Sequence, residues 1–351
     1  LPSGYEPGTH WYYCNAAVHI LSGIITEVTG MSALDYAAEE LFAPLGITAY
    51  EWSASPTGVT LGYSDLKLSP RDMAKLGYLY LNDGQWDGQQ IIPADFVQES
   101  LTSQIMTPWP ATGYSYLWWR VEPINLTFAL GFGGQYIMVF PDKNLVVAAT
   151  SAMTENIRVG LQAYPMFFAA AGLSTADEPL AENPTAFQTL QTLVADIHEP
   201  AAQAVPPMPP LVETVSGQMY GLSATNLFMS SDGIRRFTRY EDLSDSLAIN
   251  WFRLTFDDSA QATLTFGFTD NETWDIPIGL DGMYRISEGR PGVIGAKGEW
   301  LGDSTFRVYV RYKDFLHIHR FDFNFIPGGL DIISYDYVAG QGIAVQGVAM
   351  Q

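Results

Sequence analysis

Cysteine and basic residues are the scarce residue classes in this 351-residue sequence, and each scarcity excludes a class of protein. Cys14 is the single cysteine, so the chain can form no internal disulfide and offers no cysteine cluster for zinc. The 17 Lys and Arg residues face 38 Asp and Glu residues, which gives a net charge of −21. A field of this sign repels phosphate, which disfavours nucleic acid and anionic membranes as partners and favours neutral or cationic ones.

Long apolar runs are also absent from the sequence. No stretch of about 18 apolar residues occurs, so no membrane-spanning helix is expected. The first residues carry neither a basic start nor an apolar segment, and no signal peptide is expected within this sequence. Hydrophobic residues nevertheless make up 47% of the chain and charged residues 16%, which indicates a folded protein, and the length predicts about two domains.

Residues 7–17 form the segment on which the chemical hypotheses depend. A Pro-Gly turn leads to Tyr13, Cys14 and Asn15, and an amphipathic helix follows. Asn15 is predicted to be the N-cap of that helix, and its amide could share a cleft with the Tyr13 hydroxyl. An ordinary N-capped helix after a turn is the alternative. Cys14 could be a nucleophile, but no neighbouring histidine supports that role, so a small buried thiol is preferred.

Several short motifs follow one another in a fixed order. They are Pro7-Gly8-Thr9, Tyr13-Cys14-Asn15-Ala16, Val28-Thr29-Gly30-Met31-Ser32, Tyr36, Leu41-Phe42-Ala43-Pro44-Leu45-Gly46-Ile47 and Ser69-Pro70-Arg71-Asp72-Met73-Ala74-Lys75-Leu76-Gly77. This order resembles the serine β-lactamase-like family, which includes class C β-lactamases, DD-peptidases, esterases and 6-aminohexanoate-oligomer hydrolases. Over about residues 5–173, the resemblance implies an α+β fold, a β-lactamase/transpeptidase-like domain with an antiparallel sheet and helices.

The resemblance also implies roles for two residues. Tyr13 would be the acid/base partner of a Ser-x-x-Lys nucleophile, and Asn15 would supply an amide that orients the substrate. The family's acyl-transfer chemistry uses no metal or organic cofactor. Family members are typically extracytoplasmic, so a periplasmic or secreted location is expected.

Ser64-Asp65-Leu66-Lys67 is the only Ser-x-x-Lys in the sequence. The mechanism requires the Ser at a helix start and the Lys one turn later on the same face. Ser69 and Pro70 have the pattern of an N-cap and a first helical residue, which predicts a helix that begins after Lys67. The family also places its nucleophile before Tyr-x-Asn. Ser64 and Lys67 are therefore interpreted as a coincidental match.

The nucleophile is consequently expected outside this chain. An N-terminal piece carrying Ser-x-x-Lys, on a separate polypeptide or in a longer gene product, would be the partner that completes the site. The alternative is a relative that has lost its chemistry. If the family's first strands and first helix are missing, apolar faces of the helix after Asn15 and of the sheet are expected to lie open.

The segment Gly131-Phe132-Gly133-Gly134-Gln135 is the second chemical candidate. Its glycines would let a strand edge approach a ligand closely, and a backbone N–H there can donate to an oxyanion. A glycine bulge beside a hairpin is the alternative.

The resemblance aligns this segment with the strand that lines the family's cleft. The family has Lys-Thr-Gly there, or His in place of the Lys, whereas this chain has Phe132, Gly133 and Gly134. These three residues would contact the substrate, and the Gln135 amide would contribute to the oxyanion hole. Phe132 cannot attract a carboxylate by charge, which favours uncharged amide or ester substrates.

The chain is predicted to divide into three segments. Residues 1–199, with helices at 158–171 and 185–197, form the β-lactamase-like domain, residues 200–214 a Pro-rich linker, and residues 215–351 a second domain. About eight or nine strands separated by Asp, Asn and Gly turns predict an antiparallel β-barrel there. This barrel resembles the lipocalin-like domains that follow some family members. His317 and His319 share one strand face, and without a third ligand nearby a surface pair is preferred over a metal site.

The sequence therefore predicts the C-terminal portion of a serine hydrolase followed by a β-barrel. The expected reaction is acyl transfer on a small-molecule amide or ester. A non-catalytic binding or scaffold protein that keeps the cleft and the barrel is the alternative.

Overall fold

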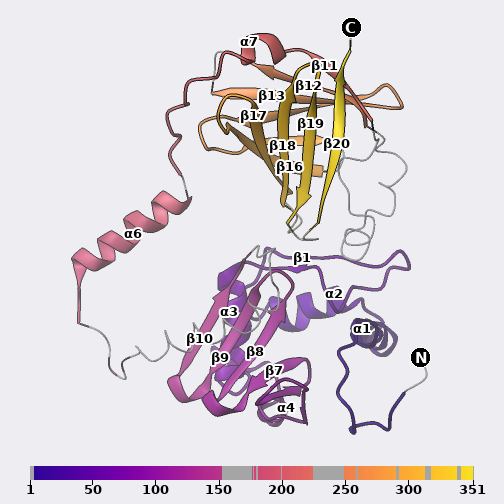
Figure 1. The fold of residues 1–351 in the computed structure, drawn as a ribbon. Coiled ribbons are helices and arrows are strands. Elements are labelled where there is room, and N and C mark those ends of the chain that lie inside the picture. Colours follow the sequence, from indigo (N-terminus) through magenta and orange to yellow (C-terminus); the bar gives the residue numbers. More distant parts are fainter. Residues whose placement is uncertain are drawn as a thin grey trace. The chain divides into compact units, whose positions relative to one another are not determined.

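The computed structural model describes residues 4–151, 176, 178, 181–198, 200–223, 249–257, 260–289, 292–312, 318–337 and 341–350. The described residues up to 178 belong to one compact unit and those from 181 onward to a second (Figure 1). The helix expected at residues 158–171 lies outside the described residues. The finer boundaries at 199/200 and 214/215 stay predictions.

The helices of the first unit begin close to where their capping residues predict. They are α1 (Asn15–Thr29), α2 (Ala33–Ala37) with a π-helical extension (Ala38–Phe42), α3 (Pro70–Leu81) and α4 (Ala94–Ser100). Ser32 and Ser69 each accept a hydrogen bond from the backbone N–H three residues later, which confirms the predicted N-cap Ser69 and makes Ser32 the N-cap of α2.

The N-cap of α1 differs from the prediction. Cys14, with an extended backbone (φ −140°, ψ 99°), is the N-cap, and its carbonyl accepts from the N–H groups of Ala17 and Val18. Asn15 is the first helical residue, so the expectation that it caps the helix was wrong. The Cys14 side chain makes no capping hydrogen bond, and its thiol is half-buried and free. The N-terminus of α1 thus lacks the side-chain acceptor that stabilises α2 and α3.

Much of the apolar surface of α1 is open to solvent. Ile20, Leu21 and Ile24 are each about half exposed, Val28 is 78% exposed, and Ser22 is the buried residue of the helix. Such exposure is unusual on an amphipathic helix and indicates a surface that another segment can cover. Among the described residues, no single helix is long and apolar enough to cross a membrane. The helices Asn15–Thr29 and Ala33–Phe42, which are bent by 77° relative to one another, have the length and composition of a membrane span only when taken together.

An antiparallel six-stranded sheet forms the centre of the first unit. Its strand order is β10-β9-β8-β7-β6-β5. The strands are β5 (Ile105–Met106), β6 (Thr112–Ser115), β7 (Trp118–Val121), β8 (Leu126–Gly131), β9 (Gln135–Phe140) and β10 (Leu145–Ala149). Two short pairs lie outside it, β1 (Glu51–Trp52) with β2 (Leu66–Lys67) and β3 (Gln85–Trp86) with β4 (Gln89–Gln90).

Two strands differ from the sequence pattern. The aromatic-rich sequence from Tyr114 to Arg120 predicts one strand, but the segment is a hairpin, because Tyr116 and Leu117 adopt left-handed φ values of 41° and 74° and Ser115 pairs with Trp118. No Asn-Gly or Asp-Gly signal marks this turn. The continuous apolar sequence of the last strand, β10, predicts full burial, but the strand is half-buried because it forms an edge of the sheet.

Helix α3 packs on the sheet through Gly77. A Cβ atom at Gly77 would lie 2.6 Å from a methyl carbon of Val146 on β10 and 2.9 Å from one of Ile137 on β9. A β-branched side chain cannot move such a methyl group without leaving its rotamer, so the close approach requires glycine. In contrast, a Cβ atom at Gly23, inside α1, would meet nothing within 4 Å.

Gly77→Ala is therefore expected to destabilise the protein by about 1–3 kcal/mol, because overpacking separates α3 from the sheet. Gly23→Ala, the matched control in a helix interior, should stabilise it by about 0.5–1 kcal/mol through helix propensity alone. Urea unfolding followed by tryptophan fluorescence measures both changes. Equal effects of the two substitutions would contradict the packing argument.

The second unit contains helix α6 (Pro184–His198), the short helix α7 (Val212–Val215) and a ten-stranded sheet. Its strands are β11 (Met219–Leu222), β12 (Ile249–Phe256), β13 (Gln261–Phe268), β14 (Thr273–Gly279), β15 (Arg285–Gly289), β16 (Gly292–Trp300), β17 (Thr305–Tyr312), β18 (Ile318–Ile326), β19 (Gly329–Asp336) and β20 (Gln341–Ala349). A pairing between β14 and β16 closes the sheet on itself, which confirms the predicted barrel (Figure 1).

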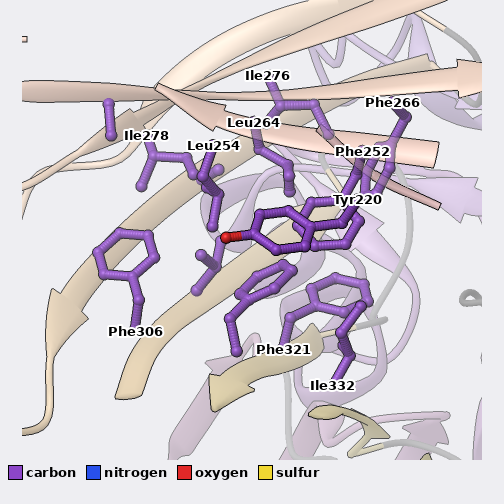
Figure 2. Close-up of a cluster of buried hydrophobic side chains, with 14 of the residues drawn as sticks. Tyr220, Phe252, Leu254, Leu264, Phe266, Ile276, Ile278, Phe306, Phe321 and Ile332 are labelled. Atoms are coloured by element: carbon purple, nitrogen blue, oxygen red, sulfur yellow. The ribbon is translucent and has the colours of Figure 1, made fainter. Parts of the chain in front are cut away.

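Aromatic side chains fill the interior of this barrel. Phe252 on β12 lies 5.2 Å, between ring centroids, from Phe323 on β18, although β11, β20 and β19 separate the two strands around the wall. Phe256 reaches Phe306 on β17 in the same way at 4.9 Å. Figure 2 shows the rings of this cluster gathered around Tyr220. Opposite walls therefore touch through their side chains, and the interior is a packed core.

Part of the predicted Pro-rich linker packs onto the same core. Val205, Met208 and Leu211 are partly buried against it, and Pro209 is buried. The N–H of Gln203 also donates to the carbonyl of Asp281 at 2.9 Å. This segment is thus attached to the second unit over much of its length.

His319 lies inside the barrel and not on its surface. It is 1% exposed, alternates with Phe321 on the inward face of β18, and places Nε2 3.5 Å from Oδ2 of buried Asp336 on β19. The surface interpretation was therefore wrong for His319, because inward positions of β18 recur every second residue. His317 lies outside the described residues.

Candidate active site

Tyr13 lies against the six-stranded sheet. Its ring stacks on Trp119 of β7, with centroids 6.0 Å apart and an angle of 19°, and 51% of the side chain remains exposed. Trp11, two residues earlier, packs between Trp109, Tyr114 and Trp119 at centroid distances of 5.3, 5.7 and 5.4 Å. Aromatic contacts therefore fix the segment on both sides of Tyr12 and hold the Tyr13 ring at the protein surface.

Tyr114 is the titratable neighbour of Tyr13. Burial first, and the proximity of Tyr13 second, raise the pKa of Tyr114 to about 12. Its ring contacts Trp119 edge-on at 4.9 Å. Tyr114 therefore keeps its proton over the pH range of ordinary enzymes, and Tyr13 is the more exposed residue of the two.

Asn15 lies in the first turn of α1, where it is exposed. It follows Tyr13 by two residues, so Tyr13 lies just before the start of α1 and Asn15 lies in its first turn. That Tyr13 and Asn15 act in one site stays a prediction, and Asn15 is not the cap of the helix.

The glycine segment forms the turn between β8 and β9. Gly133 and Gly134 have positive φ values of 82° and 93°, and the N–H of Gly134 donates to the carbonyl of Gly131 at 3.3 Å. Phe132 stands at the tip and is 37% exposed. Positive φ values at two successive positions favour glycine whether or not a ligand binds there. The hairpin alternative therefore suffices to explain why residues 133 and 134 are glycines.

The side chain of Gln135 joins β9 to the end of β10. Its Nε2 donates to the carbonyl of Ser151 at 2.5 Å and to that of Phe132 at 3.3 Å, while Oε1 accepts from the N–H of Ser151 at 3.3 Å. Tyr136 packs in the cluster that contains Trp119, so strand alternation directs the Gln135 side chain to the opposite face of the sheet. The side chain is thus engaged by the backbone of Ser151 and Phe132, and a role of the Gln135 amide in an oxyanion hole stays a prediction.

Tyr13 and the glycine turn belong to different parts of the same sheet. Tyr13 contacts β7, which pairs with β8, and the turn connects β8 to β9. That the two share one cleft, within about 12 Å and the reach of one substrate, stays a prediction.

Ser64 and Lys67 do not form a nucleophile pair. Lys67 lies on the two-residue strand β2 and forms a 2.9 Å ion pair with Glu51 on β1. The helix begins at Pro70, after Lys67, as predicted. The carbonyl of Ser64 accepts a hydrogen bond from the Trp52 indole at 3.0 Å, which fixes a loop and not a helix start.

We expect no acyl-enzyme at Ser64, because no lysine on the same helical face can take its proton. The purified chain is incubated with a fluorophosphonate or a penicillin and analysed by intact mass and peptide mapping. A stable adduct on Ser64 would show that this interpretation is wrong. Ser64→Ala, compared with the parent chain, identifies unspecific labelling.

The cluster of Trp11, Trp109, Tyr114 and Trp119 was not assigned to the site from the sequence. The aromatic richness of residues 114–119 was visible, but its contact with the Tyr13 segment joins residues about a hundred positions apart. Among the residues that the structure describes, no group of three or more His, Cys, Asp and Glu side chains is placed to hold a metal ion.

Residues 1–165 match the family model described as Beta-lactamase. This part of the chain is a beta-lactamase-family domain. A D-aminopeptidase of Brucella ovis is 43% identical to the chain over 47 residues, which cover 13% of this chain and 9% of that protein. The match thus spans less than a tenth of the relative's length.

Solved structures of low identity resemble parts of the chain. A protein assigned as a 6-aminohexanoate-dimer hydrolase from Bacillus anthracis is 23% identical, with a TM-score of 0.44 over 48% of this chain and 46% of that one. The octameric penicillin-binding protein homologue from Pyrococcus abyssi is 16% identical, with a TM-score of 0.32 over 97% of this chain and 66% of that one. Both scores are low, so the assignment of the beta-lactamase-family domain rests on its family match.

Proposed function

We propose that the beta-lactamase-family domain takes part in acyl transfer on an uncharged amide or ester. In this proposal Tyr13 moves the proton between nucleophile, leaving group and water, and Asn15 orients the substrate. The backbone N–H of Gln135 helps to hold the oxyanion, and Phe132, Gly133 and Gly134 line the substrate.

The observation that carries the proposal is the placement of Tyr13. A tyrosine general base needs a fixed ring and an accessible hydroxyl, and the stacking of Tyr13 on Trp119 and the 51% exposure of the residue support this role. Its neighbour Tyr114 has a raised pKa and does not compete as a base.

The nucleophile is proposed to come from residues outside the 351 of this chain. The Ser-x-x-Lys at Ser64 has the wrong geometry, with Lys67 on a strand and paired to Glu51. The exposed residues Ile20, Leu21, Ile24 and Val28 of α1 offer an apolar surface that a segment carrying the nucleophile can cover.

Phe132 supports an uncharged substrate at the position where the resemblance has a basic residue. The net charge of −21 acts in the same direction, because it lowers the local concentration of anionic substrates. Small amides and esters without an essential carboxylate are therefore the proposed substrate class.

The test is activity-based labelling of the protein purified, without denaturation, from the organism that makes it. A fluorophosphonate label is expected on a segment that co-purifies with the chain. The labelled residue should be the serine of a Ser-x-x-Lys that lies outside residues 1–351. Label on Ser64 would overturn the proposed nucleophile. A single unlabelled 38.7 kDa species that unfolds cooperatively and binds no hydrophobic dye would favour the non-catalytic scaffold instead.

A further inference from the structure

Basic residues gather in one part of this acidic chain. Residues 285–320 contain seven of its 17 Lys and Arg residues and four of its 38 Asp and Glu residues. Lys297, Arg307, Arg311 and Arg320 are the described members on β16, β17 and β18. Their inward neighbours in sequence, such as Ala296, are buried in the barrel core, so strand alternation places the four on its outer face.

Cations and tyrosines alternate in a row across strands β16, β17, β18 and β19. Lys297 pairs in register with Tyr309, Tyr309 with Arg320, and Arg320 with Tyr335. Adjacent strands lie about 4.8 Å apart, so Lys297 and Arg320 are about 10 Å from one another. The guanidinium of Arg320 also lies 5.3 Å from the Tyr335 ring centroid. We call this row, together with Arg311 and Tyr284, the cationic face.

The cations of this part of the barrel differ in how their charge is neutralised. Arg307 donates to both oxygens of Asp322 at 2.6 and 2.8 Å, and Arg320 lies 3.4 Å from the same carboxylate. Lys297 and Arg311 instead lie 5.1 and 5.2 Å from the ring centroid of Tyr284, and no described carboxylate is within ion-pair distance of either. These two charges are therefore available to an external anion.

Gly295 makes this arrangement possible. A Cβ atom there would lie 3.4 Å from Cβ and Cδ1 of Tyr284 and 3.0 Å from Cδ1 of Ile286, so the bare backbone gives the Tyr284 ring its place on the strand. Gly295 pairs in register with Arg311 and is two residues from Lys297. The ring is thereby set beside both cations.

We propose that the cationic face binds an acidic polysaccharide through its carboxylate groups. Lys297 and Arg311 contact carboxylates, and the partly buried Tyr309 and Tyr335 add apolar contacts with sugars. Tyrosine suits this role because it offers an apolar face and a polar edge at low entropic cost. The surface belongs to the second unit and does not depend on the hydrolase proposal.

A sparsely charged glycan fits better than a nucleic acid. Duplex DNA carries one phosphate charge per roughly 1.7 Å of helix axis, and the chain's net charge of −21 opposes such a dense polyanion at long range. Carboxylates on every second sugar, as in hyaluronate, are more widely spaced, and this reduces the repulsion. Contacts with sugar faces add affinity that is independent of charge.

The test measures binding of the full chain to hyaluronate oligosaccharides by calorimetry or fluorescence anisotropy at about 0.02 M salt, where the Debye length is long. The Lys297→Gln/Arg311→Gln variant is expected to bind about tenfold more weakly, which corresponds to about 1.4 kcal/mol. The Lys67→Gln/Lys143→Gln variant has the same change in net charge and should bind within about twofold of the parent. Tyr309→Ala should weaken binding at unchanged charge.

Several results would overturn the proposal. Binding no tighter than to neutral dextran, or equal binding by the two double variants, would exclude recognition by this face. Tighter binding to single-stranded DNA, lost in the Lys297→Gln/Arg311→Gln variant, would replace the glycan by a polynucleotide. An unchanged unfolding midpoint of each variant shows that any loss is not due to unfolding.

Discussion

Tyr13→Phe is expected to lower kcat of the assembled hydrolase by about 10²–10⁴-fold, because the variant keeps the ring and loses the group that moves the proton. KM should change by no more than a few-fold, since the stacking on Trp119 is retained. The measurement is steady-state hydrolysis of an uncharged ester by the preparation that carries the labelled serine.

Tyr12→Phe is the matched control. Tyr12 is adjacent in sequence and 79% exposed, so the loss of its hydroxyl should leave kcat within about twofold of the parent.

Because burial and Tyr13 raise the pKa of Tyr114 to about 12, a basic limb of the rate profile well below that pH cannot come from Tyr114. Equal kcat values for Tyr13→Phe and the parent enzyme would remove Tyr13 from the mechanism.

Phe252→Ala is expected to destabilise the barrel by about 3–5 kcal/mol. Phe252 is fully buried and contacts both Tyr220 and Phe323, so its removal opens a cavity in the packed interior. Equilibrium unfolding in urea, followed by circular dichroism, gives the change in free energy.

Ile333→Ala provides the comparison on the outer surface of the same barrel. Ile333 is 39% exposed on β19, and its truncation should cost less than about 1 kcal/mol. If Phe252→Ala cost no more than Ile333→Ala, the interior would have to contain space into which the walls relax.

Local signals in the sequence predicted most of the barrel. Strands such as β16 and β17 lie between Gly and Asp turns, and these turns in the sequence predict where both strands begin and end. The flanking strands β11 and β20 were not predicted, because β11 has four residues and β20 is interrupted by Gly342 and Gly347. Their pairing with distant strands compensates for weak local patterns.

The candidate site could be predicted only in part. The Tyr-x-Asn motif and the glycine turn are visible as short patterns, but the support for Tyr13 comes from Trp119, far away in the chain. Burial of His319 was missed for a similar reason, since its partner Asp336 is on the next strand. The N-cap at Cys14 could not be anticipated either, because cysteine offers no strong acceptor and the backbone alone defines it.

The seam between β11 and β20 bears on how the chain is made. Tyr220 pairs with Ala349, and the side chain of Gln218 donates to the carbonyl of Met350 at 2.8 Å, so the first and last described strands of the barrel lie side by side. A ribosome synthesises about 130 residues between these two partners, and the wall cannot close before the last of them emerges. Until then the aromatic interior is exposed, which makes the nascent barrel a substrate for chaperones. A truncation that removes Ala349 and its neighbours should therefore be more harmful than the surface position of these residues suggests.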